Sequence, residues 1–177
     1  MKIERTWAMP SANTFSIRPV NALLSEIIAD NRFIFRDKSK IIDPFSFGSR
    51  IGDVTNDLNP FVDSDYHLDA IDFLRKFEDK SVTGVLFDPP YSPRQVSECY
   101  LKLGKTVNMK TTQASFWSDL KKEISRIVKP CGFCVTCGWN SGGIGVKYGF
   151  SIERILLVAH GGWHNDTIIT VEKRREP

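Results

Sequence analysis

The sequence is short of the features that mark exported and membrane proteins. It has no uninterrupted apolar run long enough to span a bilayer and no signal peptide, so we expect a cytoplasmic protein without membrane contact. Only four cysteines are present, and without an export signal we expect no disulfides. Neither sign of charge dominates, because the net charge is +3 and the pI is near 8.7. This balance permits a nucleic-acid partner but does not require one.

The rest of the composition is that of an ordinary globular protein. Hydrophobic residues make up 41% of the 177 positions and charged residues 25%. A chain of this length is large enough for one substantial core and too short for two. We therefore expect residues 1–177 to form a single domain.

Three cysteines are spaced in a way that raises the question of a metal site. Cys131, Cys134 and Cys137 follow a Cys-x-x-Cys-x-x-Cys pattern, and His160 and His164 lie downstream. The same cysteine segment also reads as a β-strand, in which Cys134 would face away from Cys131 and Cys137. That arrangement is poor geometry for a shared ion, and free cysteine is among the most buried residue types. We expect a buried strand and no metal ligands.

The most informative stretch begins with the apolar run of residues 81–87, Ser-Val-Thr-Gly-Val-Leu-Phe. This run predicts a buried strand, and the two prolines after it predict a short, stiff loop at the edge of a sheet. Pro89 and Pro90 have no N–H group, so the loop offers carbonyl oxygens with few competing donors. Asp88 adds a carboxylate and Tyr91 adds a flat ring.

This combination suits an amine that is attached to a planar heterocycle. Such an amine is a poor nucleophile because its lone pair is conjugated with the ring. Hydrogen bonds from its two N–H groups to the Asp88 carboxylate and the Pro89 carbonyl would draw the nitrogen towards tetrahedral geometry and favour attack on an electrophile. Tyr91 would stack on the ring, so a base in a duplex would first have to leave its helix.

The loop Asp88-Pro89-Pro90-Tyr91 resembles the catalytic motif of nucleic-acid amino-methyltransferases that use S-adenosylmethionine, above all the adenine-specific DNA enzymes. The resemblance implies an α/β fold, namely a single doubly wound Rossmann-like domain with a mostly parallel seven-stranded sheet and an antiparallel final strand. It implies catalytic roles for all four loop residues, S-adenosylmethionine as cofactor and DNA as partner, with RNA not excluded. It runs from about residue 10 to residue 173 and leaves no insertion large enough for a separate target-recognition domain.

The segment before the first expected helix carries the resemblance further. Residues 20–29 have the apolar spacing of an amphipathic helix. The preceding Phe15-Ser16-Ile17-Arg18-Pro19 resembles the motif that lines the methionine end of the cofactor in many of these enzymes. The resemblance implies cofactor contacts for Asn13, Thr14 and Phe15, and the alternative is a purely structural arm.

A turn after the short expected strand at residues 40–42 gives the next match. Asp43-Pro44-Phe45 resembles the start of the family's Asp-Pro-Phe-x-Gly-x-Gly turn, whose glycines let the backbone approach the cofactor closely. Phe47 stands where the first of those glycines is expected. The turn therefore either uses Gly48, one residue later, or binds the cofactor more weakly. Cofactor contacts are implied for Asp43, Phe45 and Gly48.

Two further aspartates are candidate cofactor ligands. Asp57 follows a short predicted strand, and a carboxylate at the tip of the second strand can accept both ribose hydroxyls of a nucleoside cofactor. We prefer Asp57 to Asp53 because Asp57 lies at the carboxyl tip, and the alternative is a solvated turn aspartate. Residues 66–77 predict a helix. Asp69-Ala70 at its start resembles the family motif that binds the cofactor's adenine amine, and the alternative for Asp69 is a helix N-cap.

The second half of the chain has a basic segment and regular elements. Arg94, Lys105 and Lys110 lie beside the expected site, where we expect phosphate contacts or a substrate lid rather than only a solvated face. Helices are predicted over residues 93–103 and 117–128, and a Gly-rich crossing at residues 139–145 could start another short helix. Residues 152–159 and 167–172 predict two final strands.

The expected function is N6-methylation of adenine in DNA. Alternatives left open are methylation of the cytosine amine, whose enzymes resemble these with Ser in the place of Asp88, and of guanine or adenine in rRNA. Phe47 also leaves open a degenerate subunit that binds nucleic acid without turnover. Target recognition could come from a homodimer or from a partner subunit.

Overall fold

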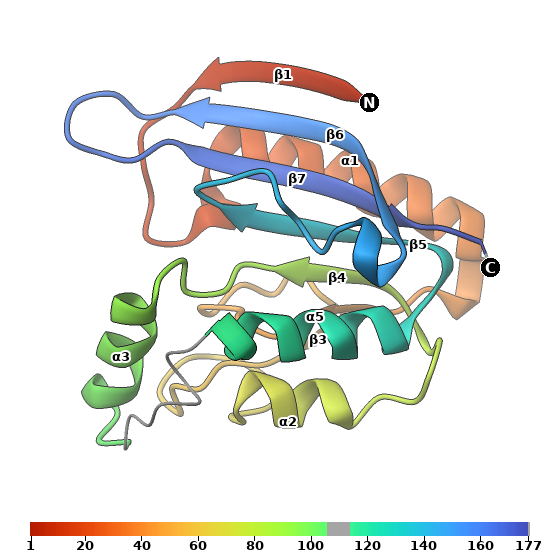
Figure 1. The fold of residues 1–177 in the computed structure, drawn as a ribbon, viewed down its shortest axis with the longest axis horizontal. Coiled ribbons are helices and arrows are strands. Elements are labelled where there is room, and N and C mark those ends of the chain that lie inside the picture. Colours follow the sequence, from red (N-terminus) through yellow and green to blue (C-terminus); the bar gives the residue numbers. More distant parts are fainter. Residues whose placement is uncertain (106–113, 177) are drawn as a thin grey trace.

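The computed structural model describes residues 1–105 and 114–176. Within them, a seven-stranded sheet has the strand order β1-β6-β7-β5-β4-β2-β3 (Figure 1). Its strands are β1 (Lys2–Trp7), β2 (Ile41–Asp43), β3 (Val54–Thr55), β4 (Val82–Phe87), β5 (Val128–Gly138), β6 (Phe150–Ala159) and β7 (Thr167–Arg174).

The strand directions confirm the predicted fold class. Neighbouring strands are parallel in the pairs β1·β6, β4·β5, β2·β4 and β2·β3, whereas β7 is antiparallel to both β5 and β6. Six strands of this sheet therefore run in one direction, and the last strand of the chain runs in the other. As a consequence, the carboxyl ends of all strands except β7 meet at one edge, where ligands bind in open α/β sheets.

Helices cover both faces of the sheet. Helix α1 (Arg18–Phe35) lies on one face, α2 (Ala70–Arg75) and α5 (Ala114–Ile127) lie on the other, and α3 (Pro93–Lys102) stands beyond the end of β4 (Figure 1). Three short 3-10 turns are η1 (Thr14–Ser16), η2 (Arg36–Lys38) and η3 (Val146–Tyr148). Because successive strand residues point to opposite faces, Leu86 packs in the α1 core and Phe87 in the α2/α5 core. All six residues of β4 are buried, as the apolar run predicted.

The cysteine segment is the strand that its pattern indicated. It forms the interior of β5, with Cys137 in the core under α1 and Cys134 in the opposite core. Three expected helices and the two expected final strands are also present. The helices are those expected at residues 20–29, 93–103 and 117–128. The observed ends lie within one to a few residues of the expected ones, except that α1 continues to Phe35.

Three features differ from the expectations. The helix predicted over residues 66–77 is only Ala70–Arg75, because Tyr66 instead forms an isolated bridge with Asn56 and Asp69 caps the helix by accepting a 3.1 Å hydrogen bond from the Ile71 N–H. The Gly-rich crossing starts no helix before η3. Strand β1 was not predicted at all.

The crossing from β5 to β6 is held by a buried carboxylate. Glu172 of β7 is fully buried and accepts hydrogen bonds from the N–H groups of Ile144 and Gly145, at 2.5 and 2.9 Å.

None of the described helices is both long and apolar enough to cross a membrane.

Candidate active site

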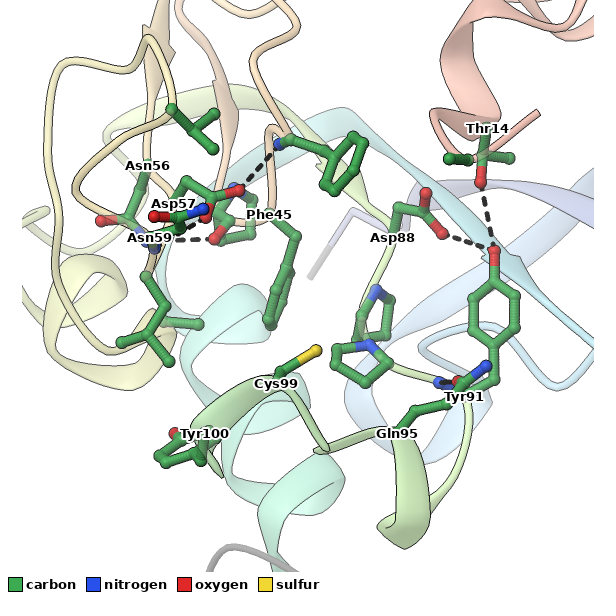
Figure 2. Close-up of a pocket in the computed structure, with 18 of the residues that line it drawn as sticks. Thr14, Phe45, Asn56, Asp57, Asn59, Asp88, Tyr91, Gln95, Cys99 and Tyr100 are labelled. Carbon is green, nitrogen blue, oxygen red and sulfur yellow. Dashed lines mark hydrogen bonds between the residues drawn. The ribbon is translucent and has the colours of Figure 1, made fainter. Parts of the chain in front are cut away.

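A cavity of about 460 Å³ lies at the edge where the parallel strands end. Its walls come from the segments that follow β2, β3 and β4, from the segment of residues 11–14 at the start of η1 and from α3. Single residues of α2, α5 and β7 also line it, namely Ala70, Phe116 and Thr167. Segments far apart in the sequence therefore share one site, as Figure 2 shows. A volume of this size suits a small-molecule cofactor or substrate.

Asp88 and Tyr91, from the loop after β4, are hydrogen-bonded to each other. The Tyr91 hydroxyl donates to Asp88 Oδ1 at 2.5 Å and lies 3.4 Å from the Thr14 hydroxyl (Figure 2). Tyr91 therefore does more than present a ring, because its hydroxyl holds the carboxylate in position. Burial and the nearby Asp88 charge raise the pKa of this hydroxyl, which keeps it a donor.

The second oxygen of Asp88 is available to a ligand. Asp88 Oδ2 accepts no hydrogen bond from a described residue, and it is not one of the buried unpartnered atoms, so it borders the cavity. Burial raises the pKa of the Asp88 carboxyl, and the hydrogen bond from Tyr91 and the nearby Thr14 hydroxyl partly oppose that rise. The carboxyl is thus a stronger proton acceptor than an exposed aspartate.

The two proline carbonyls have different surroundings. Trp117 on α5 donates its indole N–H to the Pro90 carbonyl at 3.1 Å. In the described part of the chain no group donates to the Pro89 carbonyl, although Pro89 lines the cavity. Gln95 on α3 fixes the end of the loop by accepting the Tyr91 backbone N–H at 2.6 Å. Trp117 and Gln95 thus hold the loop in place, and of the two proline carbonyls only that of Pro89 has no described donor.

Asp57 lies on the opposite side of the cavity, beyond the tip of β3. One carboxylate oxygen accepts the Phe47 N–H at 2.9 Å and the other accepts the Asn59 N–H at 2.8 Å (Figure 2). The rejected candidate, Asp53, instead binds Arg32 at 2.7 Å and the Ile41 N–H at 2.8 Å and does not line the cavity. Of the two aspartates only Asp57 lines the cavity, and its role as a cofactor ligand stays a prediction.

The turn after β2 adopts a glycine-like backbone in spite of its sequence. Phe47 has φ of 46° and Gly48 has φ of 78°, so both residues are left-handed. A bulky side chain in this region costs on the order of 1–2 kcal/mol. Phe47, not Gly48, lines the cavity, and its side chain is mostly exposed.

Asp43 is a buried carboxyl with an incomplete set of partners. Its Oδ1 accepts the Phe45 N–H at 3.0 Å, whereas the fully buried Oδ2 has no hydrogen-bond partner among the described residues. Burial raises the pKa of Asp43 well above its ordinary value, and the charges of Asp88 and Asp57 add to the rise. Three carboxyl groups thus lie in or beside one cavity, an arrangement that favours a positively charged or proton-donating ligand.

Comparisons with solved structures identify the architecture. A putative methylase from Haemophilus influenzae superposes with a TM-score of 0.54 at 8% identity, over 88% of this chain and 98% of that one. An N-methyltransferase from Bradyrhizobium japonicum, in complex with S-adenosylhomocysteine, gives 0.54 at 7% identity, over 89% and 88%. The 1,6-didemethyltoxoflavin-N1-methyltransferase of Burkholderia thailandensis, also with S-adenosylhomocysteine, gives 0.52 at 9% identity, over 97% and 94%.

The fold is that of S-adenosylmethionine-dependent methyltransferases. No protein-family model and no curated protein matches the sequence. At identities this low the likeness concerns the fold, so the roles of individual residues rest on their own geometry.

Within this methyltransferase fold, the sequence-predicted residues divide into two groups. Those that line the cavity are Thr14, Phe45, Asp57, Ala70, Asp88, Pro89, Pro90 and Tyr91. Asn13, Phe15, Asp43, Gly48 and Asp69 do not line it. Phe15 is buried in the core under α1, and Asn13 caps η1. Asp69 caps α2 and accepts a hydrogen bond from the Tyr100 hydroxyl. These placements favour structural roles for the three, and the cofactor contacts remain predictions.

The predicted nucleic-acid contacts are less well defined. Arg94 is exposed and pairs with Glu98 at 2.8 Å on the outer side of α3. Lys105 is exposed just after α3. Lys110 lies outside the described residues.

Several residues of the site carried no signal that sequence reasoning used. Gln95 and Trp117 fix the loop, and Asn56 ties its surroundings together by donating to the Pro44 and Leu68 carbonyls, both at 3.1 Å. Trp139, just after β5, packs edge-on against Tyr91 with ring centroids 5.5 Å apart. The position of Gln95, four residues after Tyr91 at a helix start, is the only local clue among them.

Proposed function

We propose that the protein transfers a methyl group from S-adenosylmethionine to the exocyclic amine of adenine in DNA. The observation that carries this proposal is the pair of unoccupied acceptors on one wall of the cavity, Asp88 Oδ2 and the Pro89 carbonyl. Two acceptors from one rigid loop match the two N–H groups of a primary amine on a base. The fold supports the proposal because ligands of open α/β sheets bind at the edge that holds this cavity, and two neighbours with this fold carry S-adenosylhomocysteine.

The residues around the cavity fit the proposed cofactor. S-adenosylmethionine carries an ammonium group, a positively charged sulfur, a ribose with two hydroxyls and an adenine ring. Asp57, which lines the cavity, can accept ribose hydroxyls with its unused lone pairs. Apolar contacts for the adenine are available on Phe45, Leu68 and Ala70. When bound, the cofactor supplies an electrophilic methyl group.

The loop after β4 would then activate the target amine. Asp88 Oδ2 and the Pro89 carbonyl accept one N–H each, which draws the nitrogen out of conjugation and aims its lone pair at the methyl carbon. Tyr91 keeps Asp88 from turning away. Because burial raises the pKa of Asp88, its carboxylate is suited to take up the proton that the methylated nitrogen releases.

The test combines a binding measurement with product analysis. The purified chain is titrated with S-adenosylhomocysteine by calorimetry and incubated with S-adenosylmethionine and unmethylated DNA, and the digested nucleosides are analysed by mass spectrometry. We expect N6-methyl-2′-deoxyadenosine in the digest from the wild type and none from Asp88→Ala, with the affinity of the variant for S-adenosylhomocysteine within a few-fold of wild type. Asp119→Ala, an exposed carboxylate on α5, serves as the matched control and should remain active.

A different methylated nucleoside would assign the reaction to another base, and full activity of Asp88→Ala would remove that carboxylate from the mechanism. RNA incubated in parallel distinguishes the two kinds of nucleic acid.

A second candidate function is favoured by Phe47. Its aromatic side chain lines the cavity where a glycine would leave room for a ligand, which suits a subunit that keeps the fold without turnover. If the wild type does not bind S-adenosylhomocysteine in the calorimetric titration and Phe47→Gly does, the result would favour the subunit without turnover over the enzyme.

A further inference from the structure

Three of the four tryptophans of the chain lie at the same edge of the sheet. Trp7 is the last residue of β1, Trp139 follows the last residue of β5, and Trp163 lies in the connection after β6. Because β1, β5 and β6 all run in the direction of β4, these positions are at the edge that holds the cavity. In Figure 1 this edge is on the left, where the connection from β6 to β7 reaches beyond the strand ends.

These side chains contribute little to the core. The exposed fraction of the residue is 62% for Trp7, 45% for Trp139 and 103% for Trp163, so all three present a large surface to water. Strands β5 and β1 are three strand spacings apart, or roughly 14 Å, which spreads the indoles along the edge instead of gathering them in a satellite core. Trp117, in contrast, is partly buried, and its indole N–H donates a hydrogen bond to the Pro90 carbonyl. The exposed indoles therefore need an explanation other than folding.

One end of the row of tryptophans touches the candidate active site. Trp139 touches Tyr91, with ring centroids 5.5 Å apart. The connection that carries Trp163 begins against Trp7, since a Cβ built on Gly161 would lie 3.5 Å from the Trp7 indole nitrogen. A base stacked on Trp139 would thus lie next to the group held at Asp88.

Positive charge accompanies the row. Arg5 lies two residues before Trp7 and on the same face of β1, and Arg18 is exposed at the start of α1. Lys102 lines the cavity from α3. None of these three cations forms an ion pair with another residue in the ranges 1–105 and 114–176. Cations flanking exposed aromatic rings are the arrangement with which proteins hold single-stranded nucleic acid.

We propose that Trp7, Trp139 and Trp163 stack on unpaired bases that flank the target nucleotide, so that the substrate is a single-stranded stretch of nucleic acid. This inference rests on the proposed function and narrows its substrate class. In a duplex the faces of the bases are covered by their neighbours, and an indole could reach them only by separating a base step. In a single strand the faces are open, and the target base would enter the cavity without first leaving a duplex.

The experiment measures binding of a fluorescein-labelled oligonucleotide by anisotropy, with the full chain saturated with S-adenosylhomocysteine. The oligonucleotide is offered as single-stranded DNA, as single-stranded RNA of the same sequence and as duplex DNA. The variants are Trp163→Ala, Trp7→Ala and Trp139→Ala, each paired with the corresponding tyrosine substitution. Phe33→Ala is the matched control, because Phe33 is an exposed aromatic residue near the carboxyl end of α1, away from the cavity edge.

We expect the wild type to bind a single strand more tightly than the duplex. Each alanine substitution should weaken single-strand binding by about 5- to 150-fold, the range for loss of one base–aromatic stack. The tyrosine variants should stay within a few-fold of wild type, and Phe33→Ala should be unchanged. The difference between the DNA and RNA arms then identifies which of the two carries the target, because only RNA presents a 2′-hydroxyl.

Three results would overturn the inference. These are oligonucleotide binding by the alanine variants equal to wild type, tighter binding of duplex than of single strand, and no binding of any oligonucleotide. A homodimer that sedimentation detects in the wild type and not in Trp7→Ala/Trp163→Ala would assign the row to self-association instead. The anisotropy comparison is also repeated without S-adenosylhomocysteine. If the wild type does not bind S-adenosylhomocysteine at all, that result counts against the proposed function and not against this inference.

Discussion

The hydrogen bond between Tyr91 and Asp88 gives a test that separates the tyrosine ring from its hydroxyl. Tyr91→Phe removes the 2.5 Å bond to Asp88 Oδ1 but keeps the ring and its edge-on contact with Trp139. A hydrogen bond to a charged group contributes about 1.5–3 kcal/mol. If that bond positions the carboxylate for the reaction, the turnover rate should fall by roughly 10- to 150-fold, since 1.4 kcal/mol corresponds to a factor of ten.

The pH dependence of the same variant has a definite direction. Asp88 must be ionised to accept the amine, and burial raises its pKa while the Tyr91 bond lowers it. Activity should therefore decline as the pH falls through the Asp88 pKa, and loss of the hydroxyl should move this decline to higher pH. Raising the pH should partly restore the rate of Tyr91→Phe, whereas Tyr91→Ala, which also loses the ring, should stay low.

The assay is methyl transfer from labelled S-adenosylmethionine to nucleic acid over a range of pH, with Tyr148→Phe as control. Tyr148 lies on η3, and its hydroxyl makes no hydrogen bond within the described residues. A Tyr91→Phe enzyme with the turnover and the acid limb of the wild type would refute the reasoning, because the hydroxyl would then have no role and the ring alone would matter.

Three further changes test the cofactor site, the core and a buried charge. Asp57→Ala should weaken S-adenosylhomocysteine binding by about 1.5–3 kcal/mol in calorimetry. Asp53→Ala should instead lower the melting temperature and leave this affinity intact. Equal affinities of both variants for S-adenosylhomocysteine would mean that Asp57 is not a ligand. Gly84→Ala should cost about 1–3 kcal/mol in denaturant unfolding, because its Cβ would lie 2.2 Å from the Phe133 ring, and Phe133→Leu should restore much of the loss; a stable single variant would contradict this packing. Burial raises the pKa of Glu172, so the folded state binds the Glu172 proton more tightly than the unfolded state does. The free energy of unfolding should therefore decline as the pH rises from the unfolded-state pKa towards the raised pKa. Glu172→Gln should flatten this decline, and an unchanged pH profile in the variant would show that Glu172 does not cause it.

The parts of the fold that were predictable are those whose signal is local. Strand β4 is an apolar run ended by two prolines, and α3 begins with Ser92 and Pro93 in cap positions, so neighbouring residues suffice to specify them. Strand β1 was missed because it is an edge strand. Its alternation places Ile3 and Trp7 on a largely exposed face, so it shows no apolar face of its own and depends on pairing with β6, some 150 residues away.

The candidate site was predictable to the same extent. The loop after β4 and the choice of Asp57 follow from strand ends, which lie at one edge in any parallel sheet. The partners of the loop do not, because Thr14, Trp117 and Trp139 reach Tyr91 or Pro90 only after α1, α5 and β5 have packed. Residue type suggested stacking for Tyr91, whereas the contact that its hydroxyl makes depends on how the loop folds around Asp88.

The surroundings of the loop also explain why it would select a primary amine. Trp117 donates to the Pro90 carbonyl and Tyr91 donates to Asp88 Oδ1, whereas Asp88 Oδ2 and the Pro89 carbonyl, in two residues that line the cavity, accept no hydrogen bond from a described residue. A group with a single N–H would leave one of these two acceptors unpaired in a partly buried site, at a cost of about 1–3 kcal/mol. A group with two N–H bonds on one nitrogen satisfies both. On the proposed function, we therefore expect the discrimination to come from these two acceptors, and Trp117→Phe, which frees the Pro90 carbonyl, should relax it.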